Sequence, residues 1–176
     1  FIVSSLGQQD SPGAARNPVH IYVVYGRAVL RDDLDLALLS PSDGFRIVVP
    51  AELVSIDASI SIASTGDIND DGFGDIVIGG VTAQTSWVLF GSNSSDNVDV
   101  SALTPSQGFV LKAAARRLGI SLDGVGDFNG DGISDIVIGA PKDVHCSSVD
   151  ASAFIVFGRQ SGFMDMDLDN MAQNHG

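Results

Sequence analysis

The amino-acid sequence predicts an all-β fold, and three observations point to it. Short runs rich in Ile, Val and aromatic residues are bounded by Gly, Asp, Asn and Ser, which is the pattern of strands separated by turns. No segment carries the apolar periodicity and the caps of an ordinary helix of about 8–20 residues. Similar phrases also recur at intervals of about 60–65 residues, which indicates a repeat architecture.

The expected strands follow one another in a fixed order within each repeat. One repeat contains four of them, at residues 60–64, 75–79, 86–91 and 109–113. An apolar run that ends in an aromatic residue and Gly occurs three times, as HIYVVYGR (20–27), TSWVLFGS (85–92) and AFIVFGR (153–159). Four strands in about 60 residues is the content of one blade of a β-propeller.

We therefore predict a β-propeller segment of about three four-stranded antiparallel blades, within a single partial domain at residues 1–176. The repeats divide the chain into four parts, an incomplete blade at 1–49, a complete one at 58–112, an incomplete one at 117–158, and the start of a further repeat at 159–176. Because a propeller generally closes with at least four blades, the segment should either continue into further blades or expose sheet edges. Tyr22, Tyr25, Trp87 and Phe157 lie on the strand patterns, and we expect them in the core between blades.

Two acidic loops precede expected strands, in GDINDDGFGDIVIGG (66–80) and GDFNGDGISDIVIGA (126–140). Oxygen-bearing side chains fall at positions 1, 3, 5 and 9 of each loop, and alternation in a curled loop turns positions 1, 3 and 5 toward one point. Gly72 and Gly132 at position 6 permit a sharp turn, and position 7 would offer a backbone carbonyl. Such oxygen ligands suit Ca²⁺. The candidate metal ligands are Asp67, Asn69, Asp71, Phe73 and Asp75 in one loop, and Asp127, Asn129, Asp131, Ile133 and Asp135 in the other.

Other interpretations of these loops explain less. An EF-hand requires a bidentate Glu at position 12 and flanking helices, whereas Ile78 and Ile138 occupy that position and the flanks resemble strands. A plain Asp/Asn/Gly turn is the simplest alternative, but two copies in register disfavour it. Magnesium favours fewer protein ligands and more retained water. The sequence thus predicts two calcium sites.

The charge of the chain limits its partners. Nine basic and 22 acidic residues give a net charge of −13, which argues against nucleic acid as a partner and favours cations. No apolar run is long enough to span a bilayer, so we expect no membrane insertion by this segment. A single cysteine provides no disulfide framework within the chain. No arrangement of a nucleophile, base and oxyanion site is apparent, so we expect no enzymatic activity.

With both loops and the aromatic-Gly strands in view, the sequence resembles the FG-GAP repeats of the integrin α-subunit β-propeller. Phe90-Gly91, Phe157-Gly158, the two acidic loops and Gly139-Ala140-Pro141 carry the likeness, with Tyr25-Gly26 as a variant. The complete repeat departs from the pattern, because Gly79-Gly80-Val81 stands where the family has Gly-Ala-Pro. The resemblance implies a seven-bladed propeller with calcium in its lower loops and with protein or glycan partners bound by its upper loops.

The resemblance also implies an extracellular or cell-surface location and a role in recognition or cell adhesion, with calcium serving a structural purpose. Two alternatives remain open at this point. The propeller could be a noncatalytic domain attached to a secreted hydrolase, or a structural repeat of a large secreted protein, because a fold alone does not determine a function.

Overall fold

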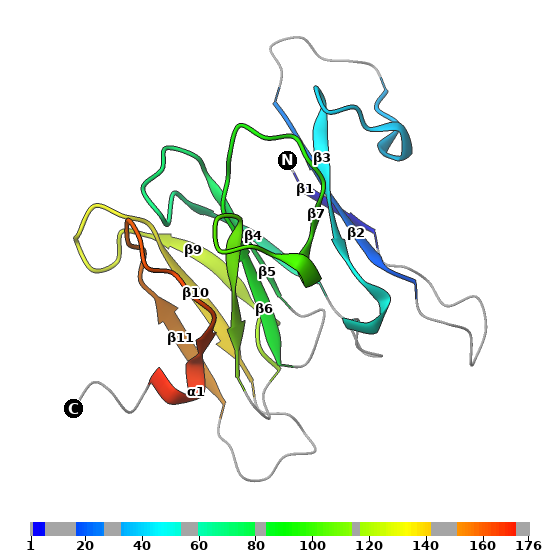
Figure 1. The fold of residues 1–176 in the computed structure, drawn as a ribbon. Coiled ribbons are helices and arrows are strands. Elements are labelled where there is room, and N and C mark those ends of the chain that lie inside the picture. The colour runs from blue at the N-terminus through cyan, green and yellow to red at the C-terminus, as the bar shows by residue number, and fades with distance from the viewer. Residues whose placement is uncertain are drawn as a thin grey trace. The chain divides into compact units, whose positions relative to one another are not determined.

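The computed structural model describes residues 2–5 by their backbone and residues 17–26, 33–53, 60–79, 84–113, 117–141 and 151–171. Almost all of its regular structure is β-strand, in sheets that are mainly antiparallel (Figure 1), so the all-β prediction is confirmed. The chain divides into two compact units. Within the described residues, no helix is long and apolar enough to cross a membrane.

The first unit comprises residues 1–54 and 93–103. Its sheet has the order β1-β2-β3-β7, with the strands β1 (Ile2–Ser5), β2 (Val19–Val24), β3 (Gly44–Val49) and β7 (Val98–Asp99). Three short 3-10 helices accompany the sheet, η1 (Leu36–Leu38), η2 (Ala51–Leu53) and η3 (Val100–Ala102). Fully buried side chains alternate over part of these strands, at Val19 and Ile21 of β2 and at Ile47 and Val49 of β3, because successive side chains of a strand point to opposite faces.

The second unit comprises residues 55–92 and 104–176 and holds two sheets. The larger has the order β12-β8-β6-β5-β4. Its strands are β4 (Ser61–Gly66), β5 (Asp75–Gly79), β6 (Thr85–Leu89), β8 (Gly108–Lys112) and β12 (Met166–Asp167), the last followed by helix α1 (Leu168–Met171). The smaller sheet has the order β11-β10-β9, formed by β9 (Leu122–Gly126), β10 (Asp135–Ala140) and β11 (Ser152–Val156).

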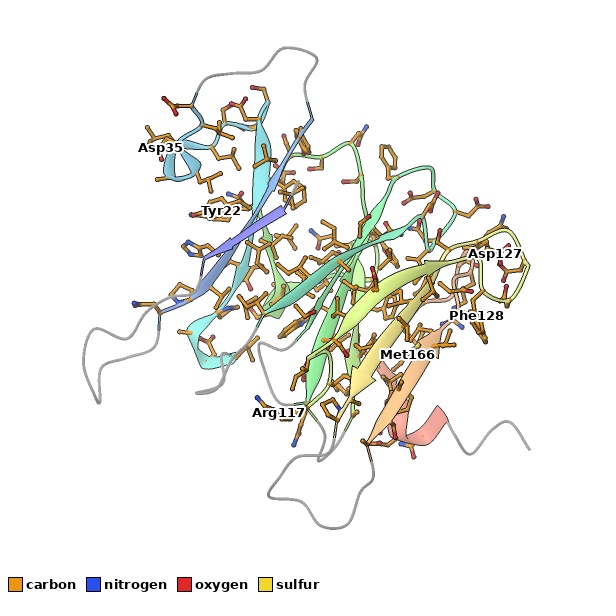
Figure 2. All side chains as sticks on the ribbon, turned by 180° about the vertical axis from the view of Figure 1, so that it is seen from behind. Tyr22, Asp35, Arg117, Asp127, Phe128 and Met166 are labelled. Atoms are coloured by element: carbon orange, nitrogen blue, oxygen red, sulfur yellow. The ribbon has the colours of Figure 1, made fainter. Side chains whose placement is uncertain are left out.

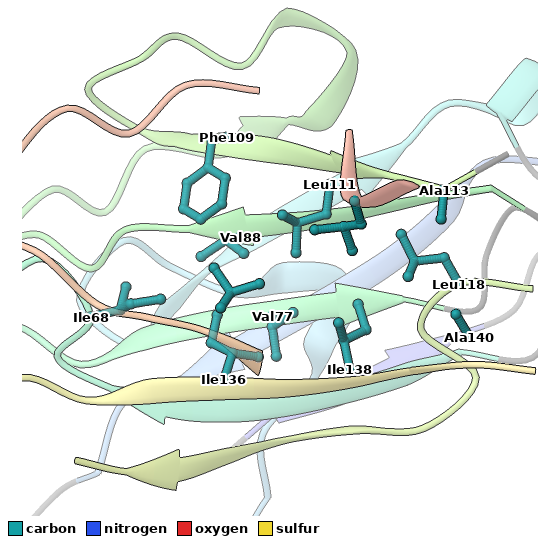
Figure 3. Packing of buried hydrophobic residues seen from close by; sticks show 12 residues of the cluster. Ile68, Val77, Val88, Phe109, Leu111, Ala113, Leu118, Ile136, Ile138 and Ala140 are labelled. Carbon is teal, nitrogen blue, oxygen red and sulfur yellow. The ribbon is translucent and has the colours of Figure 1, made fainter. Parts of the chain in front are cut away.

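The hydrophobic core of the second unit lies between these two sheets (Figure 3). Val77 of β5 and Val88 of β6 pack in one cluster with Ile136 and Ile138 of β10, and all four side chains are fully buried. Each buried aliphatic side chain of this size stabilises the fold by about 1.5–3 kcal/mol relative to exposure. The cluster therefore joins the larger and the smaller sheet of the second unit.

The segment after β11 returns to the larger sheet. Its Phe163 ring stacks on Phe109, with ring centroids 4.7 Å apart, and lies 5.4 Å from the ring of Phe90. The carboxylate of Asp165 accepts a hydrogen bond of 3.0 Å from the backbone N–H of Val110, and β12 then pairs in parallel with β8. The chain that follows β11 thus supplies the outermost strand to a sheet whose other strands all precede β9.

Most of the predicted strands are observed within one or two residues, and β5 has the predicted bounds. The two-residue parallel strands β7 and β12 were not predicted. Trp87 is only 3% exposed, as expected for a core residue, whereas Phe157 is 49% exposed, so its assignment to the core was wrong. The division into blades at 1–49, 58–112 and 117–158, and the number of blades, stay predictions.

Candidate metal loops

The two acidic loops connect the strands of two β-hairpins. Loop 1 (residues 67–75) joins β4 to β5, and loop 2 (residues 127–135) joins β9 to β10. Figure 2 shows Asp127 and Phe128 of loop 2 at one end of the hairpin formed by β9 and β10. Both loops belong to the second unit.

In loop 1, the side chains at positions 1, 3 and 5 curl around the backbone of positions 5 to 7. The carboxylate of Asp67 accepts hydrogen bonds from the N–H groups of Asp71, at 3.1 Å, and Gly72, at 2.8 Å. Asn69 donates from its amide to the carboxylate of Asp71 at 2.8 Å, and Asp71 accepts from the N–H of Phe73 at 2.9 Å. The structure therefore brings the predicted residues Asp67, Asn69 and Asp71 together.

Loop 2 repeats this arrangement. Asp127 accepts from the N–H groups of Asp131, at 2.9 Å, and Gly132, at 2.8 Å. The amide of Asn129 donates to the Asp131 carboxylate at 2.9 Å, and Asp131 accepts from the N–H of Ile133 at 2.9 Å. Two loops that lie 60 residues apart in sequence thus share these internal hydrogen bonds, and loop 2 has one more, from the N–H of Gly130 to Asp127 at 2.7 Å.

The glycines at position 6 have the backbone conformation that the sequence predicts. Gly72 has φ 90° and Gly132 has φ 92°, in the region that residues with a Cβ rarely adopt. Position 4 differs between the loops, since Gly130 has φ 83° while Asp70 has φ 57°. A left-handed conformation is uncommon for a residue other than glycine, although Asp tolerates it better than most.

The carboxylates at position 9 lie at the boundary between loop and core. Asp75 and Asp135 are fully buried at the first residues of β5 and β10. One oxygen of Asp75 accepts from the N–H of Ile68 and the other from the N–H of Gly91, both at 2.7 Å. Asp135 accepts in the same way, at 2.8 Å, from the N–H groups of Phe128 and Gly158.

Gly91 and Gly158 also belong to these loop arrangements, although the acidic pattern of the sequence did not include them. They are the glycines of the aromatic-Gly phrases, and the backbone N–H of each donates to a buried carboxylate. A Cβ on Gly91 would press against the backbone carbonyl of Gly74, and one on Gly158 against that of Ser134. The recurrence of aromatic-Gly at the same place in each repeat was the signal available in the sequence.

Burial raises the pKa of Asp75 from its ordinary value to about 6. The hydrogen bonds from Gly91 and Ile68 oppose this rise, and the nearby carboxylates of Asp71 and Asp67 add to it. Near neutral pH the ionised form of Asp75 is therefore held in surroundings that disfavour its charge. A bound cation would offset this cost locally.

The chemistry of these donors fits a hard divalent cation. Each loop presents carboxylate and amide oxygens, and no described Lys or Arg forms an ion pair with them. Within the described residues, no group of three or more His, Cys, Asp or Glu is placed to hold a metal, and the oxygens of Asp75 and Asp135 accept from backbone N–H groups. Metal binding by the ten candidate residues stays a prediction.

Comparison with known proteins finds matches for part of this chain. Residues 119–156, which include β9, loop 2, β10 and β11, match the FG-GAP repeat model. The chain is also similar to integrin alpha-2, with 34% identity over 84 residues to the mouse protein and 35% over 86 residues to the bovine protein. Each match covers 46% of this chain and only 7% of the relative.

Proposed function

We propose that this chain is part of a calcium-stabilised β-propeller that serves recognition or adhesion at the cell surface or outside the cell. The FG-GAP match and the similarity to integrin alpha-2 support a propeller module of this kind. The observation that carries the calcium assignment is the pair of loops with the same inward-facing oxygens above a buried carboxylate. In this proposal calcium has a structural role and the chain has no catalytic one.

Each site would use five residues of one loop. Asp67, Asn69, Asp71 and Asp75 would offer side-chain oxygens in loop 1, with the backbone carbonyl of Phe73 as a fifth donor. Asp127, Asn129, Asp131, Asp135 and the carbonyl of Ile133 would do the same in loop 2. The position 9 carboxylates can retain their backbone hydrogen bonds, because a carboxylate oxygen has more than one acceptor site.

The expected affinity is modest. Extracellular calcium modules commonly have dissociation constants of about 10⁻⁴–10⁻³ M. At millimolar calcium, each site would then stabilise the fold by up to ~1–2 kcal/mol through mass action. Two such sites are a substantial share of the stability of a small domain.

Substitution of a single ligand tests the calcium assignment. We expect Asp131→Ala to reduce the rise in melting temperature that calcium produces. The substitution removes one oxygen ligand of the proposed site and two hydrogen bonds that the carboxylate accepts within loop 2. The matched control is Asp123→Ala, since Asp123 lies outside the loop and, among the described residues, its carboxylate accepts from the neighbouring N–H of Gly124 at 2.9 Å. Equal effects of the two substitutions, or no calcium response in the unmodified chain, would refute the assignment.

The proposed partners are protein or glycan ligands, together with adjoining blades of the same propeller. An immobilised sample of the chain, exposed to matrix proteins and to a glycan array with calcium or with EDTA, would test this part of the proposal. Calcium-dependent capture of one ligand class supports recognition. Failure to retain any ligand in either buffer would contradict a recognition role for this part of the propeller.

A further inference from the structure

A short segment after β11 contacts loop 1 of the preceding repeat. We call residues 158–160 the inter-repeat clamp. The N–H of Arg159 donates to the backbone carbonyl of Ile68 at 2.9 Å, and the side-chain amide of Gln160 donates to the carboxylate of Asp70 at 2.7 Å. A third bond joins the loops directly, because the N–H of Ser134 donates to the carbonyl of Asp67 at 3.2 Å.

These contacts connect the two buried carboxylates through the backbone. Asp75 accepts from the N–H of Ile68, whose carbonyl accepts from the N–H of Arg159. The neighbouring N–H, that of Gly158, donates to Asp135. Ile68 is fully buried, so these bonds lie where a lost partner is expensive to replace with water. A movement of either carboxylate would therefore displace the backbone that holds the other.

The side chain of Gln160 holds the one left-handed residue of loop 1 that is not glycine. Asp70 has φ 57°, and a residue in such a conformation persists only when its surroundings fix it. The corresponding residue of loop 2 is Gly130, which adopts a positive φ without that cost. Loop 1 thus needs an external contact at a point where loop 2 does not.

We propose that the inter-repeat clamp positions loop 1 for cation binding, so that the two loops bind calcium as a coupled pair. This inference depends on the calcium function proposed above. Gln160 and Arg159 are positioning residues, since they contact the loop backbone and Asp70 rather than the candidate ligands. Loosening the clamp should weaken loop 1 selectively and reduce the coupling between the sites.

Isothermal titration of the whole chain with calcium tests the proposal. Asp131→Ala leaves loop 1 as the site to be measured, and Asp71→Ala leaves loop 2. Adding Gln160→Ala to each variant separates its effects on the two loops. A parallel set with Asp70→Gly provides the matched control, because loop 1 then carries the same residue as loop 2 at position 4 and has no carboxylate for Gln160 to hold. Melting temperatures in EDTA report any general loss of stability.

We expect Gln160→Ala to weaken calcium binding at loop 1 by about 3- to 10-fold, the range of an ordinary single hydrogen bond, because the bond to Asp70 is solvent-exposed, and to leave loop 2 unchanged. It should have no effect on affinity in the Asp70→Gly background. The unmodified chain should bind two ions more tightly than the two single-site variants together predict. Amide hydrogen exchange at Arg159 should slow when loop 2 alone is filled.

Three results would overturn the inference. If two ions bind but Gln160→Ala leaves loop 1 unchanged, the clamp has no positioning role, while the calcium function stands. If both loops weaken together with the melting temperature in EDTA, the contact serves only the fold. If the unmodified chain binds no calcium, the proposed calcium function and this inference fail together.

Discussion

Loops 1 and 2 have nearly the same sequence and hydrogen bonds, yet their surroundings differ. Ile68 of loop 1 is fully buried, whereas Phe128 at the same position of loop 2 is 63% exposed. The aromatic residues that precede Gly91 and Gly158 differ in the same way. Phe90 packs against the core and Phe163, whereas Phe157 is half-exposed. A repeat therefore determines the shape of its own loop, and the residues that pack beside it determine how deeply the loop is buried.

The largest expected effect is a difference in stability loss between the two loops when the residue at position 2 is replaced by alanine. Ile68→Ala should lower the free energy of unfolding by about 2–5 kcal/mol, because it leaves a cavity in a packed core. Phe128→Ala should change it by no more than about 0.5 kcal/mol, since the side chain is mostly exposed. Urea unfolding at fixed calcium measures both. Similar losses for the two variants would show that loop 2 is as well covered as loop 1.

A smaller effect is expected at the glycines that contact the buried carboxylates. Gly158→Ala should destabilise the fold by about 1–3 kcal/mol through overpacking, because its Cβ would press on Ser134 and on Ile133. Gly91→Ala should have a comparable cost against Gly74 and Phe73. Gly74→Ala is the control, since a Cβ there meets no atom within 4 Å. Thermal unfolding in EDTA measures the three variants. Equal melting temperatures for all three would contradict the role of the aromatic-Gly phrases.

A pH dependence of the stability is also expected, and it arises at loop 1. Asp75 has a folded-state pKa of about 6, above its ordinary value of 3.8, so between these values the folded chain binds more protons than the unfolded chain. Its contribution to stability in EDTA is therefore greatest below pH 4 and falls as the pH rises toward 6. Asp75→Asn should remove this contribution. The measurement is the urea midpoint of the unmodified chain and of Asp75→Asn at a series of pH values from 4 to 6. A constant difference between the two midpoints across this range would contradict the prediction.

Calcium should reverse this trend at the upper end of the range. A bound cation favours the ionised carboxylate, so the stabilisation by calcium should grow as the pH rises through 6. The same series of urea midpoints, repeated at millimolar calcium, measures it. A calcium effect that stayed constant from pH 5 to 7 would show that the ion does not interact with Asp75.

Local features of the sequence were sufficient to predict the loops and most of the strands. The alternation of Asp and Asn up to position 5 and the glycine at position 6 act within a few residues, so Asp67, Asn69 and Asp71 could be grouped from the sequence. The strand at 75–79 could also be delimited, because an acidic turn and glycine bound its apolar run.

The contacts that join the loops to the rest of the unit could not be predicted in this way. The donors to the buried carboxylates are backbone N–H groups, and every residue except proline has one. Nothing in the identity of Arg159 marks its N–H as the partner of Ile68, some 90 residues earlier. The exposure of Phe157 depends in the same way on what packs beside it, which alternation along one strand does not reveal.

Because β12 pairs in parallel with β8, the boundary of this sheet does not coincide with a boundary between sequence repeats. A proteolytic cut just after Gly158 would respect the sequence repeat but would detach Phe163, Asp165 and the outermost strand from a sheet whose other strands all precede residue 113. The two sheets that end in β7 and β12 are each completed by a strand that is synthesised later. A nascent chain would therefore carry one uncompleted sheet edge until that strand emerged.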